Sequence, residues 1–157
     1  MSWMWSGWVW RVGAMACLLA VVYANERFNL ANPDLERKLV GCWGSKVDGG
    51  KAFLALSALD LRDNGSFLEQ GSESFLNGEM KKPVSAEGTW SVRKNKLTLS
   101  YVKSTASWLL PRAGQALRLV VLEIGDASLK AKGDNPTGMS LEFSRLGGPT
   151  ACRLPGI

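Results

Sequence analysis

The side chains that most often perform catalysis are absent from this chain or too far apart to act together. The chain has no histidine, which removes histidine-based triads, histidine general bases and nearly every metal site built from imidazole. It also lacks a phosphate-binding loop, a metal-binding cysteine cluster and a Gly-x-Ser-x-Gly elbow. We therefore predict no catalytic residue, no metal, no cofactor and no enzymatic activity.

Carboxylates are the remaining candidates for acid/base chemistry. The glutamates concerned are separated along predicted strands and do not have the spacing of a catalytic pair. They are Glu69, Glu87, Glu123 and Glu142. Solvated outer faces of strands account for most of them.

One connector carries the best candidates for a contact with a ligand or partner. Residues 104–114 read STASWLLPRAG, so that Trp108, Leu109 and Leu110 stand where a polar turn would suffice. Contiguous apolar groups on a loop can gate a ligand, enter a membrane or dock a partner. The alternative is that Trp108 folds back as a lid on the protein's own core.

Strand signals dominate the chain after residue 38. Alternating apolar and polar residues, separated by turn-forming Asp, Asn and Gly, predict about eight short strands. Their ranges are 39–46, 53–62, 66–75, 84–93, 96–103, 115–124, 128–132 and 139–146. We predict an all-β fold, an antiparallel up-and-down barrel with Leu97, Leu99 and Tyr101 on an inner face. Residues 117–124 are apolar on both faces, which predicts either a cover by a helix or partner, or a bulge.

Residues 1–24 have the features of an export segment. Arg11 is their only charge, the apolar run after it has the length of a signal-peptide core, and Val22-Tyr-Ala24 suits signal peptidase. The alternative is a retained signal anchor, a transmembrane helix that would hold Arg11 in the membrane at a cost of about 2.5–3.5 kcal/mol. Both interpretations place the rest of the chain outside the cytoplasm, in the periplasm tethered to the inner membrane, or secreted. Residues 25–38 then form a linker with a short helical turn.

Cysteine usage agrees with export. Cys17 lies in the apolar segment, which leaves Cys42 and Cys152 for the exported part. In an oxidising compartment they can form a disulfide worth up to about 4.7 kcal/mol in the chain-entropy model. The alternative is two unpaired thiols, one of them buried. We predict the bond.

Two short Gly-x-Trp motifs organise the predicted strands, Gly41-Cys-Trp43 and Gly88-Thr-Trp90. In each, the glycine allows a neighbouring chain to pass close, and the ring can lie across the floor of a small barrel. Together with the 59–67 and 88–99 hairpins and the closing segment 141–145, these motifs make the chain similar to the lipocalin-like, or calycin-type, small barrels of exported bacterial proteins. The resemblance covers most of residues 34–146.

The resemblance implies specific roles for three residues within a barrel domain at 39–157. In lipocalins an arginine near the end of the barrel stacks on the Gly-x-Trp tryptophan, so Arg145 is expected over Trp43. Trp43, Trp90 and Arg145 are then structural, and the cysteine-bearing tail is tied to the wall. The short strands depart from larger lipocalins and predict little internal cavity.

The sequence leaves two functions open. The first is a non-enzymatic interaction module, exported or tethered to the membrane through residues 1–24, that serves a cell-envelope complex. The second is a carrier that binds a small apolar or amphipathic ligand inside the barrel. A carrier predicts a cavity of about 300 Å³ or more, whereas a module predicts a filled interior and an outer apolar patch. The net charge of +5 concentrates in residues 80–122, where scattered lysines and arginines favour a solvated exterior, and we predict no nucleic-acid partner.

Overall fold

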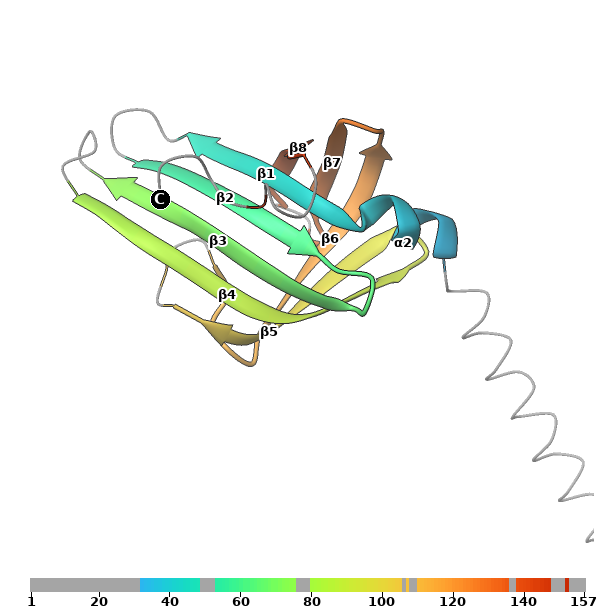
Figure 1. Ribbon diagram of the computed structural model, residues 1–157, viewed down its shortest axis with the longest axis horizontal. Coiled ribbons are helices and arrows are strands. Elements are labelled where there is room, and N and C mark those ends of the chain that lie inside the picture. The colour runs from blue at the N-terminus through green and yellow to red at the C-terminus, as the bar shows by residue number, and fades with distance from the viewer. Residues whose placement is uncertain are drawn as a thin grey trace, which may run out of the picture.

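The computed structural model describes residues 32–48, 53–75, 80–105, 107, 110–135, 138–147 and 152. In this part of the chain, one short helix precedes eight antiparallel strands that close into a barrel (Figure 1). The elements are α2 (Pro33–Leu39), β1 (Gly41–Asp48), β2 (Phe53–Leu61), β3 (Ser66–Phe75), β4 (Met80–Arg93), β5 (Lys96–Ser104), β6 (Ala116–Ile124), β7 (Ser128–Gly133) and β8 (Ser140–Arg145). Each strand pairs with the next, and β8 returns to pair with β1. The predicted all-β, up-and-down barrel is confirmed.

The predicted export segment, residues 1–24, lies outside the described residues, as does the first part of the predicted linker. The hydrophobic N-terminal helix therefore stays a prediction. Within the described ranges, no helix has both the length and the apolar character needed to cross a bilayer.

Helix α2 covers the end of the barrel at which β1 begins (Figure 1). Asn32 caps it by accepting a hydrogen bond from the Leu35 N–H at 3.1 Å, and Pro33 occupies the first turn, where a missing N–H costs nothing. The Asn32 side chain also donates to the carbonyl of Lys94 in the β4–β5 turn, at 3.0 Å. Leu35 and Leu39 are buried against the core. The cap thus sets both the start of the helix and its position on the barrel.

Strand β4 begins at Met80, earlier than the predicted start at Val84. Pro83 argues against a strand at this point because it has no N–H to donate. In the barrel, Pro83 pairs with Ser72 of β3 and lies beyond the last pairing of β4 with β5, which joins Ala86 to Ser104. The missing donor therefore falls on an unpaired side of the strand.

Strand β6 has apolar residues on both faces, and it contains a bulge. A bulge was one of the two explanations that the sequence predicted for this pattern. The register with β7 shifts between Val121 and Glu123. Before the shift, Leu119 and Val121 are buried, and after it Ile124 packs against the same core. Leu122, the residue inserted at the shift, is 60% exposed. One extra residue thus returns the apolar positions to the inner face.

The second Gly-x-Trp motif depends on a close approach of β4 to β5. A Cβ added at Gly88 would lie 2.0 Å from the carbonyl oxygen of Ser100 and 2.8 Å from the ring of Phe67. Two residues later, the buried Trp90 donates its indole N–H to the carbonyl of Arg62 at 2.8 Å. The glycine admits the neighbouring backbone, and the tryptophan fixes the adjacent turn.

Candidate binding cavity inside the barrel

The α2 end of the barrel is closed by Trp43 and Arg145. Trp43 is fully buried and donates its indole N–H to the carbonyl of Leu39 at 2.7 Å. The guanidinium of Arg145 lies 4.4 Å from the centre of the Trp43 ring and donates to the carbonyls of Lys38, at 2.6 Å, and Val40, at 3.4 Å. This is the stacking that the resemblance implied.

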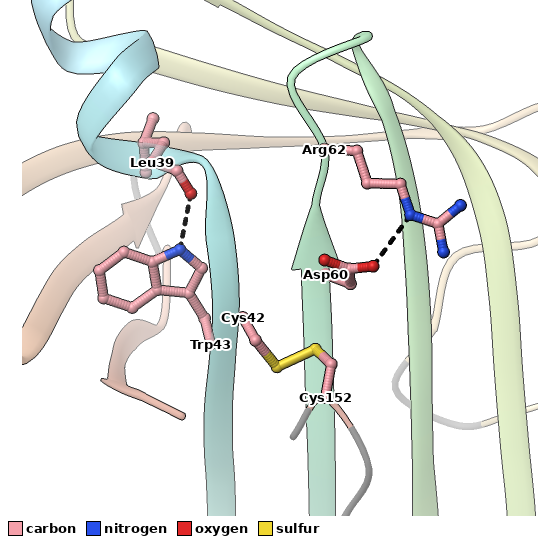
Figure 2. The surroundings of a disulfide bond; sticks show 6 residues. All are labelled: Leu39, Cys42, Trp43, Asp60, Arg62 and Cys152. Carbon is pink, nitrogen blue, oxygen red and sulfur yellow. Dashed lines mark hydrogen bonds and ion pairs between the residues drawn. A yellow bond between two sulfur atoms is a disulfide. The ribbon is translucent and has the colours of Figure 1, made fainter. Parts of the chain in front are cut away.

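A disulfide joins Cys42 to Cys152 beside this closed end, as the sequence predicted. Figure 2 shows the sulfur bridge and the Trp43 indole on opposite sides of β1, with Asp60 and Arg62 of the neighbouring segment nearby. The bridge ties residue 152 to the first strand across a sequence separation of 110 residues. Residue 152 is therefore held at β1, on the side opposite the Trp43 indole.

The barrel contains a cavity of about 150 Å³ toward its other end, where it is partly open to solvent. Residues that line it include Val47 near the end of β1, Val84 near the start of β4 and Leu117 near the start of β6. These positions lie at the strand ends away from α2. The volume is smaller than the roughly 300 Å³ expected of a ligand-binding calyx, yet the interior is not filled.

Glu69 projects into this cavity from β3 and is 8% exposed. It accepts a hydrogen bond from the Tyr101 hydroxyl at 3.0 Å. Burial raises the pKa of the Glu69 carboxyl, and hydrogen bonds from Tyr101 and Ser57 partly oppose that rise. Burial, followed by the charge of Glu69, also raises the pKa of Tyr101, which keeps its hydroxyl protonated as a donor. Ser57 in turn shares a hydrogen bond with Ser45 at 2.8 Å, so a polar chain runs across β1, β2, β3 and β5.

Glu73 lies four residues farther along β3, on the same inner face, and is 1% exposed. The Ser107 hydroxyl donates to its Oε1, and the Leu110 N–H donates to the Ser107 oxygen at 3.0 Å. Leu110 also lines the cavity and packs against the core. Ser107 and Leu110, which lie between β5 and β6, are thus linked to a buried carboxylate of the cavity.

The cavity is lined mainly by apolar side chains, which come from every strand that reaches it except β3. The apolar residues on β1 and β2 are Val47, Ala55, Leu56 and Leu59, and those on β6 and β8 are Leu117, Leu119, Leu141 and Phe143. The polar residues on β1 to β3 are Ser45, Ser57, Glu69, Ser72 and Glu73. In a closed barrel of this strand order, β3 faces the strands around β7. The two carboxylates of β3 therefore lie across the cavity from apolar residues of β6 and β8.

Positive charge lies outside the barrel. The basic side chains of residues 80–122 are exposed. Lys96 pairs with Asp134 at 2.9 Å, and Lys103 pairs with Glu87 at 2.6 Å. Among the described residues that line the cavity, none is basic.

Of the predicted contact residues, the structure describes only Leu110, which reaches the cavity. Trp108 and Leu109 lie outside the described residues. The two buried glutamates of the interior were not predicted as a site: Glu73 was not singled out, and Glu69 is an exception to the expected outer-face glutamates. Residues 67, 69 and 73 are an even number of positions apart on one strand, so their side chains point to the same face. The burial expected of Phe67 could therefore have predicted that both glutamates face the interior.

The fold and its interior define an eight-stranded antiparallel barrel with a small, mainly apolar cavity. Comparison with known proteins adds no family to this description: no family model matches the chain, and no curated protein matches it.

Proposed function

We propose that this chain is a lipocalin-like, extracytoplasmic barrel that binds a small ligand in its interior and catalyses no reaction. The observation that carries the proposal is the cavity of about 150 Å³ inside the barrel, with a mainly apolar lining that also contains hydroxyls and two carboxylates. An apolar lining favours an apolar body, and a few hydroxyls and carboxylates can orient a polar end. Its volume limits the ligand to roughly the size of a substituted benzene.

The closed α2 end supports the lipocalin-like assignment. An arginine stacked on the tryptophan of a Gly-x-Trp motif, next to a short helix that precedes β1, is the arrangement implied by the resemblance. The disulfide between Cys42 and Cys152 supports an oxidising, extracytoplasmic compartment. Cleavage or retention of residues 1–24 stays a prediction from the sequence.

The interaction-module hypothesis has less support from the described surface. Its large exposed apolar side chains are Val102 on β5, Leu122 on β6 and Met139 before β8. Val102 lies beyond the last β5–β6 pair near the cavity end, whereas Leu122 lies beyond the opposite end of that pairing. They do not form one patch. A docking site at Trp108 and Leu109 stays a prediction from the sequence, because both residues lie outside the described ranges.

Binding of benzyl alcohol tests the proposed function. This neutral probe has an aromatic body and one hydroxyl, and we expect saturable binding near millimolar Kd. The binding should appear as NMR shift changes of the Leu117 and Leu119 methyl groups, which line the cavity.

A matched pair of alanine substitutions locates the binding. Ala55→Leu fills the cavity, because Ala55 lines it and is 6% exposed, and this variant should not bind the probe. Ala116→Leu adds the same atoms at an exposed position of β6 and should bind as the parent does. Unchanged interior methyl shifts in the parent protein, or equal binding by both variants, would refute a ligand site inside the barrel.

A further inference from the structure

The outer wall formed by β4 to β7 carries four exposed cations close together. They are Arg93, Lys96, Arg118 and Lys132, and they form the basic patch. Arg93 lies directly opposite Lys96 in the β4–β5 pairing, and Val120 of β6 lies between Lys96 and Lys132 in the next two pairings. Arg118 is two residues before Val120 and shares its face of β6. With strands about 4.8 Å apart, the four backbone positions fall within about 14 Å across the sheet.

Little of this charge is neutralised within the barrel. Asp134 pairs with Lys96 at 2.9 Å, whereas the other three members of the basic patch make no ion pair within the described residues. The neighbouring carboxylates of this wall, Glu123 and Glu142, lie on either side of Lys130. The two cations that face each other across β4 and β5 repel, and like charges at such positions weaken a sheet. An anionic partner would relieve that repulsion.

The basic patch lies beside the place where the chain enters the barrel. Asn32, the first described residue, donates its side-chain amide to the carbonyl of Lys94 at 3.0 Å, and Lys94 follows Arg93 directly. The predicted export segment ends at Ala24, eight residues before Asn32. A chain of that length reaches at most about 30 Å. An anchor retained at residues 1–24 would therefore hold the basic patch within that distance of a bilayer.

We propose that the basic patch binds an anionic phospholipid surface, with the outer wall of β4 to β7 against the headgroups. Attraction between exposed charges fades beyond about 8 Å in physiological salt, so the short connection to residue 24 matters because it keeps the patch near the lipid. The outer residues between the cations include Ser91, Thr98 and Val120. They offer no ring on which a base could stack, which favours a lipid surface over a nucleic acid. This surface is independent of the cavity.

Paramagnetic NMR of the full chain in lipid nanodiscs tests this orientation. The discs contain phosphatidylcholine alone or with about 30% phosphatidylglycerol, and a gadolinium-chelating lipid marks the headgroups in both. In the anionic discs, we expect the amide signals of Lys96 and Lys132 to broaden at least about threefold more than that of Gln70, which is exposed on β3. The difference should vanish in neutral discs and in about 1 M NaCl. Equal broadening of both walls in anionic discs, or the same difference in neutral discs, would overturn the proposal.

Matched substitutions assign the effect to the basic patch. One variant replaces its three cations that make no ion pair, and the control replaces three exposed cations elsewhere, so that both lose the same charge. The first set is Arg93→Gln, Arg118→Gln and Lys132→Gln, and the control set is Lys81→Gln, Lys103→Gln and Arg112→Gln. The first variant should lose the difference in broadening while unfolding at no lower urea concentration than the parent, and the control should keep the difference.

Two results would assign the attraction elsewhere. Loss of the difference in both variants would mean that net charge alone attracts the protein to the disc, and this would overturn a specific surface. Shifts of the patch signals with a short DNA duplex, in a protein that shows no difference in anionic discs, would make the partner a nucleic acid and would also overturn the proposal. Neither result bears on ligand binding inside the barrel.

Discussion

Arg145 and Trp43 face each other across the β1–β8 pairing that closes the barrel, with the guanidinium 4.4 Å from the centre of the indole. The same guanidinium donates to two carbonyls at the end of α2. One side chain thus connects the last strand, the first strand and the helix. Its planar, forked geometry is what allows it to stack and donate at once.

Replacing Arg145 should destabilise the barrel whichever residue takes its place. We expect Arg145→Ala to lower the free energy of unfolding by about 2 kcal/mol, and Arg145→Lys to recover little of it, because an ammonium cannot stack flat while reaching both carbonyls. Urea unfolding followed by tryptophan fluorescence measures both variants. Arg118→Ala, at an exposed position of β6, should change stability by less than about 0.5 kcal/mol. Full recovery by lysine would show that charge alone matters at position 145.

Gly88→Ala should be among the most disruptive single-methyl additions in the protein. The new Cβ would lie 2.0 Å from a carbonyl oxygen of β5, so the β4–β5 pairing must separate. We expect a loss of about 3 kcal/mol or more in thermal or urea unfolding. Gly125→Ala is the control, since its Cβ would meet no atom closer than 3.9 Å. Equal stability of the two variants would contradict the close approach of β4 to β5.

Breaking the disulfide should cost stability without opening the interior. Cys152→Ser releases the tail, and the chain-entropy model gives a loss of about 2–5 kcal/mol for a loop of this length. The parent protein in dithiothreitol should unfold at the same urea concentration as the variant. If reduction leaves the unfolding midpoint unchanged, the bond does not form in the isolated protein, and the intact mass will lack the two-proton deficit.

The buried carboxyl of Glu69 should make stability depend on pH. Its pKa is raised in the folded state, mainly by burial, so the folded protein holds this proton to higher pH than the unfolded chain does. The stabilisation is complete below the unfolded value of about 4.5 and is lost as pH rises through the folded pKa. Tyr101 of β5 and Glu73 of β3 are the other titratable groups that line this cavity.

Glu69→Gln removes this dependence. Relative to the parent, the variant should gain on the order of 1 kcal/mol of stability between pH 4 and pH 8. Thermal unfolding at a series of pH values measures the difference, with the exposed Glu142→Gln as the control. A constant difference between Glu69→Gln and the parent across this range would mean that folding does not raise the pKa of Glu69.

The strand order and most strand boundaries could be predicted from the sequence because alternation and turn residues are local signals. The boundaries that moved depend on non-local partners. Pro83 is tolerated in β4 only because β5 has already ended beside it. A bulge in β6 was one of two predicted explanations for its apolar residues on both faces. The pairing register with β7 decides between them, because it shifts by one residue at Leu122.

The interior site was harder to predict because the alternation along β3 places two glutamates on the inner face, whereas their charge favours the outer face. Glu69 and Glu73 share the inward parity of Phe67, yet a carboxylate is normally assigned to the solvated face. The groups that make their burial tolerable lie far away in sequence. Tyr101 is 32 residues from Glu69, and Ser107 is 34 residues from Glu73. Only the closure of the barrel brings these partners together.

The bond between Cys42 and Cys152 turns the barrel into a covalent ring, because it joins the first strand to the segment that follows the last one. A protease that cuts one of the loops between β1 and β8 produces two pieces that cannot separate while the bond is intact. Each piece keeps its place in the pairing order, so the cut barrel can retain its closed wall and its interior. The bond thus protects the assembly as a whole against a single cut.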